Sequence, residues 1–155
     1  MSDAVQEVIH THVDQMLADG VIEPSTSGWA SPITLQREKN GTQRFCIDYR
    51  KVNAVTELDA YPLPRMESIL RKLRKARYIT TLDLKSAYHQ IPMAEASKAI
   101  TAFTVPGKGL YQFRRMPYGL TNAPATFQRL MDTIIGVEMD PFAYAYLDDI
   151  IIVTE

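Results

Sequence analysis

The sequence predicts an α+β fold, and three features of the 155-residue chain indicate that class. Three segments repeat apolar residues at helical spacing, β-rich runs flank turn residues at three places, and the resulting order is helix, hairpin, helix, strand, hairpin, helix, hairpin. With 46% hydrophobic and 23% charged residues, the composition excludes disordered, collagen-like and disulfide-dense classes. We therefore expect one folded unit with its own core.

The first third of the chain is expected to hold one helix and one hairpin. Helical spacing of apolar residues predicts an amphipathic helix over residues 4–19, which Gly20 ends. Residues 21–32 are rich in Pro, Ser and Gly and indicate a connection. The β-rich segments 33–37 and 42–49 flank an Asn-Gly pair, which is a strong hairpin signal.

A second helix and a buried strand are expected next. Two prolines, Pro62 and Pro64, introduce a helix whose basic residues face outward. Its inward-facing residues are expected to be Met66, Ile69, Leu70 and Leu73. The apolar run 78–84 predicts a buried strand, and residues 86–90 predict a short helix.

The last third is expected to hold two hairpins separated by a helix. Segments 99–105 and 110–115 surround a Pro-Gly turn. A helix fits residues 124–135, with proline in its first turn. The apolar runs 142–146 and 150–154 then form a terminal hairpin, which should be largely buried.

Charge is unevenly distributed, although 17 basic residues nearly balance 18 acidic residues. Residues 1–23 and 132–155 contain acids but no Lys or Arg, so the positive charge lies between these segments. A basic middle and an acidic end could hold phosphates beside cation-binding carboxylates. The alternative is that these clusters are ordinary solvated faces.

Three aspartates are candidates for such a cation site. Asp148 and Asp149 are adjacent at the predicted tip of the terminal hairpin, where aspartate is also a common turn residue. Asp83 ends an apolar strand, where a charge is otherwise poorly placed. If that strand lies beside the hairpin, the carboxylates converge and can bind Mg²⁺, which prefers hard oxygen ligands. Two such ions can catalyse phosphoryl transfer.

Five sequence blocks, in order and covering nearly the whole chain, carry a resemblance to a known family. The chain resembles the reverse transcriptases of retroviruses and, more closely, of long-terminal-repeat retrotransposons of the Ty3/gypsy type. The blocks are Gly20–Ser25 with Ser31-Pro32, Arg44–Asn53, Leu82–Ile91, Phe113–Phe127 and Tyr146–Asp149.

The resemblance implies the fingers and palm of a right-hand polymerase, with a ferredoxin-like palm core, truncated before the thumb. Residues 1–155 would be a single fingers-palm unit. Fingers would comprise residues 1 to about 56 and about 91–115, and palm would comprise about 57–90 and 116–155.

The implied activity is RNA-directed DNA polymerisation, the transfer of a nucleotide from a dNTP to a primer 3′-hydroxyl. Asp83, Asp148 and Asp149 would be catalytic and would bind two Mg²⁺ ions, for which Mn²⁺ can substitute. The backbone carbonyl of Leu84 would be a further metal ligand. Pro124 matches a segment that touches the template, although it is equally well explained as a helix N-terminus.

Five residues would bind the nucleotide according to the same resemblance. Arg44 matches an arginine over the triphosphate, with Arg37 or Lys39 in place of its lysine partner. A guanidinium suits phosphate because it binds two oxygens and keeps its charge. Tyr88 matches an aromatic gate beneath the sugar, and Tyr118 stands where retroviruses have glutamine. The alternative for Arg44 is that it is an ordinary exposed residue of the hairpin. The alternative for Tyr88 is that it is an ordinary core tyrosine.

The expected partners are an RNA or DNA template with its primer, a dNTP, and the thumb, connection and ribonuclease H parts of a polyprotein. No membrane is expected, since no run approaches the roughly 18 apolar residues of a span, and the location would be intracellular and cytoplasmic, including virus-like particles. Without a thumb, binding of primer and template should be weak. Two alternatives remain: a catalytically inactive, retroelement-derived nucleic-acid-binding or interaction protein, and another palm-type enzyme such as a nucleotide cyclase.

Overall fold

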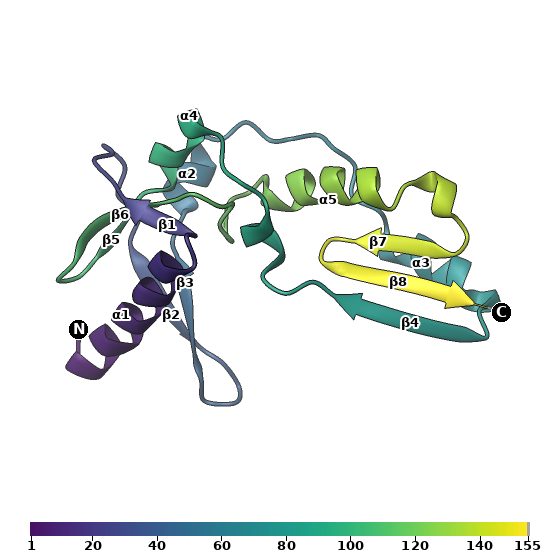
Figure 1. The fold of residues 1–155 in the computed structure, drawn as a ribbon, viewed down its shortest axis with the longest axis horizontal. Coiled ribbons are helices and arrows are strands. Elements are labelled where there is room, and N and C mark those ends of the chain that lie inside the picture. The colour runs from purple at the N-terminus through teal and green to yellow at the C-terminus, as the bar shows by residue number, and fades with distance from the viewer. Residues whose placement is uncertain (155) are drawn as a thin grey trace. The chain divides into compact units, whose positions relative to one another are not determined.

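A computed structural model describes residues 1–154, in which helices and antiparallel sheets confirm the α+β class (Figure 1). The chain forms two compact units. Unit 1 comprises Met1–Thr56 and Tyr88–Thr121, and unit 2 comprises Glu57–Ala87 and the chain from Asn122 onward. Each unit therefore needs two separate segments of the chain. Among the described residues, none of the helices has the length and apolar character needed to cross a membrane.

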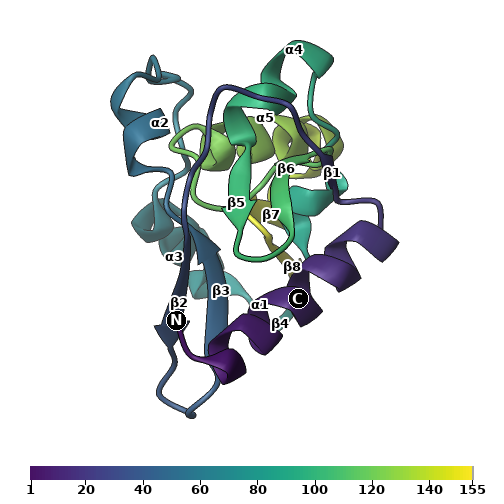
Figure 2. The same cartoon turned by 90° about the vertical axis from the view of Figure 1, so that its left-hand side faces the viewer.

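Unit 1 combines a helix, a small sheet and a separate hairpin. The predicted first helix is α1 (Asp3–Ala18), and its buried residues are Ile9 and Val13. The sheet has the order β1-β6-β5, built from β1 (Ile22–Pro24), β5 (Phe103–Val105) and β6 (Gly109–Phe113). Figure 2 brings these elements to the front.

The predicted Asn-Gly hairpin is present as β2 (Ile33–Arg37) and β3 (Gln43–Ile47). Gly41 in its turn has φ 85°, a conformation that favours glycine. Short helical segments fill the rest of unit 1 and its junction with unit 2: α2 (Arg50–Ala54), η2 (Ala87–Gln90), α4 (Glu95–Lys98) and η3 (Ala99–Thr101).

The core of unit 1 forms around large side chains from distant segments. Ile9, Tyr49, Phe103 and Phe113 are all at most 3% exposed and belong to one cluster. The Tyr49 hydroxyl donates a 2.7 Å hydrogen bond to the carbonyl oxygen of Thr101 inside this core. The buried hydroxyl group of Tyr49 therefore has a hydrogen-bond partner, as buried polar groups usually do.

Unit 2 is a three-stranded antiparallel sheet with two principal helices. The strand order is β4-β8-β7, from β4 (Tyr78–Asp83), β7 (Ala143–Tyr146) and β8 (Asp149–Thr154). The helices are α3 (Met66–Lys72), continued by η1 (Leu73–Lys75), and α5 (Ala123–Ile134), followed by η4 (Val137–Met139). Ile69 of α3 packs against Tyr144 and Ile151, which face each other across β7 and β8.

Several sequence expectations are wrong in detail. Residues 21–32 are not simply a connection, because β1 lies there and pairs with β6. Residues 99–101 form η3 rather than strand. Met66 and Leu70 do not face inward; they are 41% and 57% exposed. Helix α3 ends after seven residues, so it buries only a narrow stripe.

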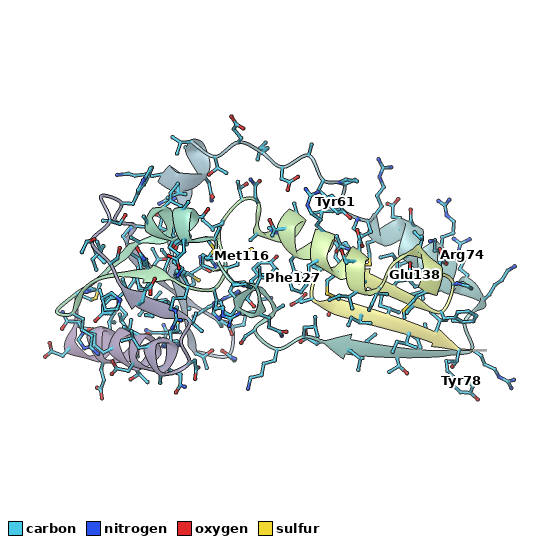
Figure 3. All side chains as sticks on the ribbon, turned by 45° about the horizontal axis from the view of Figure 1, so that its top comes forward. Tyr61, Arg74, Tyr78, Met116, Phe127 and Glu138 are labelled. Carbon is cyan, nitrogen blue, oxygen red and sulfur yellow. The ribbon has the colours of Figure 1, made fainter. Side chains whose placement is uncertain are left out.

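The strand over residues 78–84 exists, but it is not buried. Every residue of β4 is exposed, including Tyr78, Ile79 and Leu82. β4 is an edge strand, as β7 is, but the apolar cluster of the sheet is built from Ile69, Tyr144 and Ile151 and takes no residue from β4. Figure 3 shows the Tyr78 side chain projecting from the start of this strand. An apolar run alone does not distinguish an edge from a central strand.

We predict that Tyr49→Phe lowers the free energy of unfolding of unit 1 by about 1–2 kcal/mol, because the buried Thr101 carbonyl loses its donor. Urea denaturation followed by fluorescence of Trp29, the single tryptophan and part of the same unit, measures this. Tyr78→Phe, at an exposed site, is the control and should change stability by less than about 0.5 kcal/mol.

The Tyr49 effect should also depend on pH. Burial raises the pKa of Tyr49 well above its ordinary value of 10.0. A group with a raised pKa in the folded state contributes full stability below its unfolded pKa and loses it as pH rises through the folded value. The difference between wild type and Tyr49→Phe should thus shrink above pH 10.0. A difference that stays constant there would contradict this prediction.

Candidate active site

The pairing of β4 with β8 brings the first two candidate carboxylates together. The register runs from Tyr78 opposite Thr154 to Asp83 opposite Asp149. Residues directly opposite in an antiparallel pair project from the same face of the sheet. The structure thus places Asp83 directly opposite Asp149 at one end of the sheet, whereas the sequence analysis expected Asp83 to converge with Asp148 if the two strands were neighbours.

The third carboxylate lies in the tight turn between β7 and β8. Tyr146 and Asp149 pair across the hairpin, so Leu147 and Asp148 form its two-residue turn. Leu147 has φ 52°, which is uncommon for a residue with a large side chain. The carbonyl oxygen of Asp148 accepts a 3.0 Å hydrogen bond from the Leu84 amide. This bond ties the turn to the residue that follows Asp83.

The three aspartates form a cluster that can hold a cation. One carboxylate oxygen from each of Asp83, Asp148 and Asp149 lies within 4.8 Å of the others. Partial burial, and then the charges of Asp148 and Asp83, raise the pKa of Asp149 above its ordinary value. Like charges this close are unfavourable without a counter-charge. Three hard oxygen donors fit a divalent ion that takes its remaining ligands from water and phosphate.

Sequence reasoning missed one residue that contacts this turn. Gln128 of α5 is fully buried, and its Oε1 accepts a 2.8 Å hydrogen bond from the Leu147 amide. Its Nε2 donates to the carbonyl oxygen of Ala145 at 3.1 Å. A glutamine in a helical segment gives no local signal for such a role, because the contact joins residues 19 apart in sequence.

An aromatic group in unit 1 contains two of the candidate nucleotide-binding residues. Tyr88 and Tyr118 stack with ring centroids 4.6 Å apart. His89 packs edge-on against Tyr118 at 5.3 Å, and burial lowers the pKa of His89. Tyr118 is 40% exposed, so its ring can contact a ligand.

The three basic candidates lie on the β2–β3 hairpin of unit 1. Arg44 pairs in register with Gln36, whereas Arg37 pairs with Gln43. Because neighbouring positions along a strand point to opposite faces, Arg37 and Arg44 project from opposite sides of the hairpin. Lys39 lies in the turn. This register counts against Arg37 as a companion on the same face as Arg44, and Lys39 stays a prediction.

Pro124 lies in the first turn of α5, in unit 2. Asn122 is the N-cap residue, and the helix begins at Ala123, one position before the predicted start at residue 124. The helix N-terminus explains the proline by its fixed φ, and its contact with a template stays a prediction.

Residues 36–155 match the family described as reverse transcriptase (RNA-dependent DNA polymerase). The chain is 43% identical over 157 residues to the retrovirus-related Pol polyprotein from transposon gypsy of Drosophila melanogaster, covering 97% of this chain and 15% of that polyprotein. It is 36% identical over 146 residues to the transposon Tf2-3 polyprotein of Schizosaccharomyces pombe, covering 94% of this chain and 11% of the polyprotein. The chain thus spans a small part of these relatives.

Solved structures of foamy virus enzymes are also similar. The foamy viral protease-reverse transcriptase in complex with an RNA/DNA hybrid has a TM-score of 0.88 at 29% identity, covering 100% of this chain and 20% of that one. The dRH form of the enzyme in complex with double-stranded DNA has a TM-score of 0.85 at 31% identity, covering 95% of this chain and 25% of that one.

We predict that Asp148→Asn stabilises the protein in the absence of divalent cations, because it removes a like charge beside Asp149. The gain should be on the order of 0.2–1 kcal/mol, as for exposed charge pairs. Because the pKa of Asp149 is raised in the folded state, the protein gains stability as pH falls through that pKa. This gain should be smaller in Asp148→Asn, in which one of the charges that raise the pKa is gone. Thermal unfolding in EDTA at two pH values measures both effects.

Asp140→Asn is the matched control for that prediction. The Asp140 carboxylate accepts hydrogen bonds from Lys72 at 2.8 Å and from the Tyr144 hydroxyl at 3.0 Å. These partners lower the pKa of Asp140, so its replacement should destabilise the protein. Loss of stability in Asp148→Asn as well would contradict the electrostatic explanation.

Proposed function

The chain belongs to the reverse transcriptase family, and on that premise we propose that it supplies the metal and nucleotide sites of an RNA-directed DNA polymerase from a long-terminal-repeat retrotransposon. The observation that carries the proposal is the convergence of Asp83, Asp148 and Asp149. The reaction is transfer of a nucleotide from a dNTP to the 3′-hydroxyl of a primer.

The carboxylates would hold two Mg²⁺ ions, with Mn²⁺ as a substitute. When bound, these ions activate the attacking hydroxyl and stabilise the leaving pyrophosphate. Asp83 and Asp148 would be the principal ligands, and Asp149 would complete the triad. The Leu84 carbonyl is proposed as a further ligand, since the Leu84 amide already binds the Asp148 carbonyl.

Unit 1 would supply the nucleotide contacts. Arg44, with Lys39, would bind the triphosphate through charge-assisted hydrogen bonds. Tyr88 would contact the sugar and disfavour a 2′-hydroxyl, and its stacking with Tyr118 supports this proposal because it holds the ring in one orientation. Pro124 would contact the template strand.

The proposed partners follow from the relatives. The foamy viral enzymes were solved with an RNA/DNA hybrid and with double-stranded DNA, which supports a primed RNA or DNA template as the partner here. The relatives are polyproteins, so thumb, connection and ribonuclease H segments would complete the enzyme. Its location would be the cytoplasm or a virus-like particle. Units 1 and 2 would correspond approximately to fingers and palm, although the palm as proposed, about 57–90 and 116–155, includes a few residues that belong to unit 1.

We predict that the chain incorporates a labelled dNTP on a primed RNA template with Mg²⁺ at most poorly without the segments proposed to complete the enzyme, because its hold on primer and template is weak, and that the Asp148→Asn, Asp149→Asn double variant abolishes whatever incorporation is seen, because metal ligation contributes several kcal/mol. Binding of Mn²⁺, followed by electron paramagnetic resonance, is a second measurement that needs no primer.

Equal Mn²⁺ affinity in wild type and double variant would contradict the assigned site. Incorporation that survives in the variant would also contradict it. Salt-sensitive nucleic-acid binding without metal-dependent incorporation would instead favour a non-catalytic binding protein.

We predict that Tyr88→Ala weakens discrimination between dNTP and rNTP by about 10–100-fold, the effect of losing one well-placed contact. Tyr88→Phe keeps the ring that stacks on Tyr118 and should retain discrimination. Competition of rCTP with dCTP in the incorporation assay measures the ratio, and Tyr78→Ala, at an exposed edge-strand site, is the control. Unchanged discrimination in Tyr88→Ala would remove Tyr88 from the proposed gate.

A further inference from the structure

The turn that carries Asp148 depends on the orientation of one side-chain amide. Leu147 is held at φ 52°, and its amide donates to Gln128 Oε1 rather than to a strand neighbour. Residues in sparsely populated backbone regions cost about 1–3 kcal/mol and persist when their surroundings hold them. In unit 2, Gln128 is the side chain that meets the Leu147 amide.

Two acceptors fix which end of the Gln128 amide faces the turn. Its Nε2 donates to the Ala145 carbonyl oxygen at 3.1 Å and to Asp132 Oδ1 at 2.9 Å. A flipped amide would place its NH₂ group against the Leu147 amide and its oxygen against two acceptors. Asp132 therefore selects, together with Ala145, the orientation in which Oε1 accepts from Leu147.

Asp132 lies four residues after Gln128 on α5, so the two side chains occupy the same helix face. Asp132 is exposed, and an exposed carboxylate has other rotamers in water. Its second oxygen, Oδ2, accepts a hydrogen bond from the Tyr61 hydroxyl, and this bond raises the pKa of Tyr61. Tyr61 is thus the contact that keeps Asp132 directed toward Gln128.

Tyr61 is itself held against α5 (Figure 3). The Arg129 guanidinium lies 4.4 Å from the centroid of the Tyr61 ring and makes two 2.9 Å hydrogen bonds to Asp59. Asp59 Oδ1 also accepts a 2.9 Å hydrogen bond from the backbone amide of Tyr61. These bonds order the hydroxyl that reaches Asp132.

We propose that Asp132, held by Tyr61, is a positioning residue for the Asp148–Asp149 turn and acts through Gln128. The inference deepens the proposed function and rests on it. Asp132 binds neither metal nor nucleotide; it orients the amide that holds Leu147, and so fixes Asp148 in the turn and Asp149 directly after it. Contacts that orient metal ligands commonly change metal affinity when they are lost.

The first measurement is hydrogen exchange at the Leu147 amide, observed by nuclear magnetic resonance without metal or nucleotide. In Asp132→Ala, exchange at Leu147 should accelerate by about tenfold or more relative to the amide of Tyr144. Without Asp132 the Gln128 amide is less firmly oriented, so its hydrogen bond from the Leu147 amide breaks more often. Tyr61→Phe should produce a smaller change in the same direction. Thr133→Ala, at an exposed neighbouring position of α5, should leave Leu147 unchanged.

The second measurement is the affinity of the aspartate cluster for Mn²⁺. It should fall about 3–10-fold in Asp132→Ala, less than the roughly 10–100-fold typical of residues that contact a metal ligand directly. Asp132→Asn, whose carbonyl oxygen can still accept from Gln128 Nε2, should restore most of the affinity. If the proposal holds, kcat of incorporation falls with Mn²⁺ affinity while KM for the primed template stays unchanged.

A double-variant cycle tests the route through Gln128. In a Gln128→Met background, Asp132→Ala should have no further effect on Leu147 exchange or on Mn²⁺ affinity. Additive effects, or an unchanged Leu147 amide in every Asp132 and Tyr61 variant, would overturn the proposal.

These measurements distinguish a failure of the positioning role of Asp132 from a failure of the proposed polymerase function. Exchange at Leu147 requires neither metal nor polymerisation, so it reports on positioning alone. Mn²⁺ binding that persists without Asp148 and Asp149 would contradict the metal site and leave the exchange result standing.

Discussion

The pairing of β4 with β8 is the constraint on which the candidate site depends. Side chains alternate between the faces of a strand, so a slip of one residue would send Asp83 to the face opposite Asp149. The described contacts that hold this register are the β4–β8 ladder itself, from Tyr78 opposite Thr154 to Asp83 opposite Asp149, and the hydrogen bond from the Leu84 amide to the Asp148 carbonyl beyond its end. The backbone pairing thus determines where the carboxylates meet.

Two energetically unfavourable features lie at the end of that sheet: a cluster of like charges and a strained backbone conformation. Three carboxylates lie within 4.8 Å, and Leu147 has a strained φ. The strand ladder, the Leu84–Asp148 bond and the buried Gln128 hold this arrangement. Hydrogen bonds to the backbone do not cancel the mutual repulsion of like charges, which a divalent cation bound between the carboxylates would offset.

Local signals were sufficient for much of the fold and made the carboxylates candidates. Turn residues and apolar runs located the terminal hairpin, but the pairing of strand 78–83 with it entered only as a condition, which the structure meets. The non-local features were missed. Strand β1 has three residues and pairs with β6 far along the chain, and β4 is exposed because its residues take no part in the apolar cluster around Ile69. Gln128 was missed because its contact exists only after α5 packs beside β7.

Helix α5 shows why an amphipathic pattern underestimates the importance of polar positions. Its apolar residues Phe127 and Met131 are buried, as periodicity predicts. Gln128 is equally buried, although it is polar, because its amide satisfies the Ala145 carbonyl in β7 and the Leu147 amide in the β7–β8 turn. At its N-terminus, Asn122 binds the backbone of Glu57 and Asp59. One helix therefore links the packing of unit 2, the segment before α3 and the turn that carries the carboxylates, so the geometry of the site depends on residues with no charge to contribute to it.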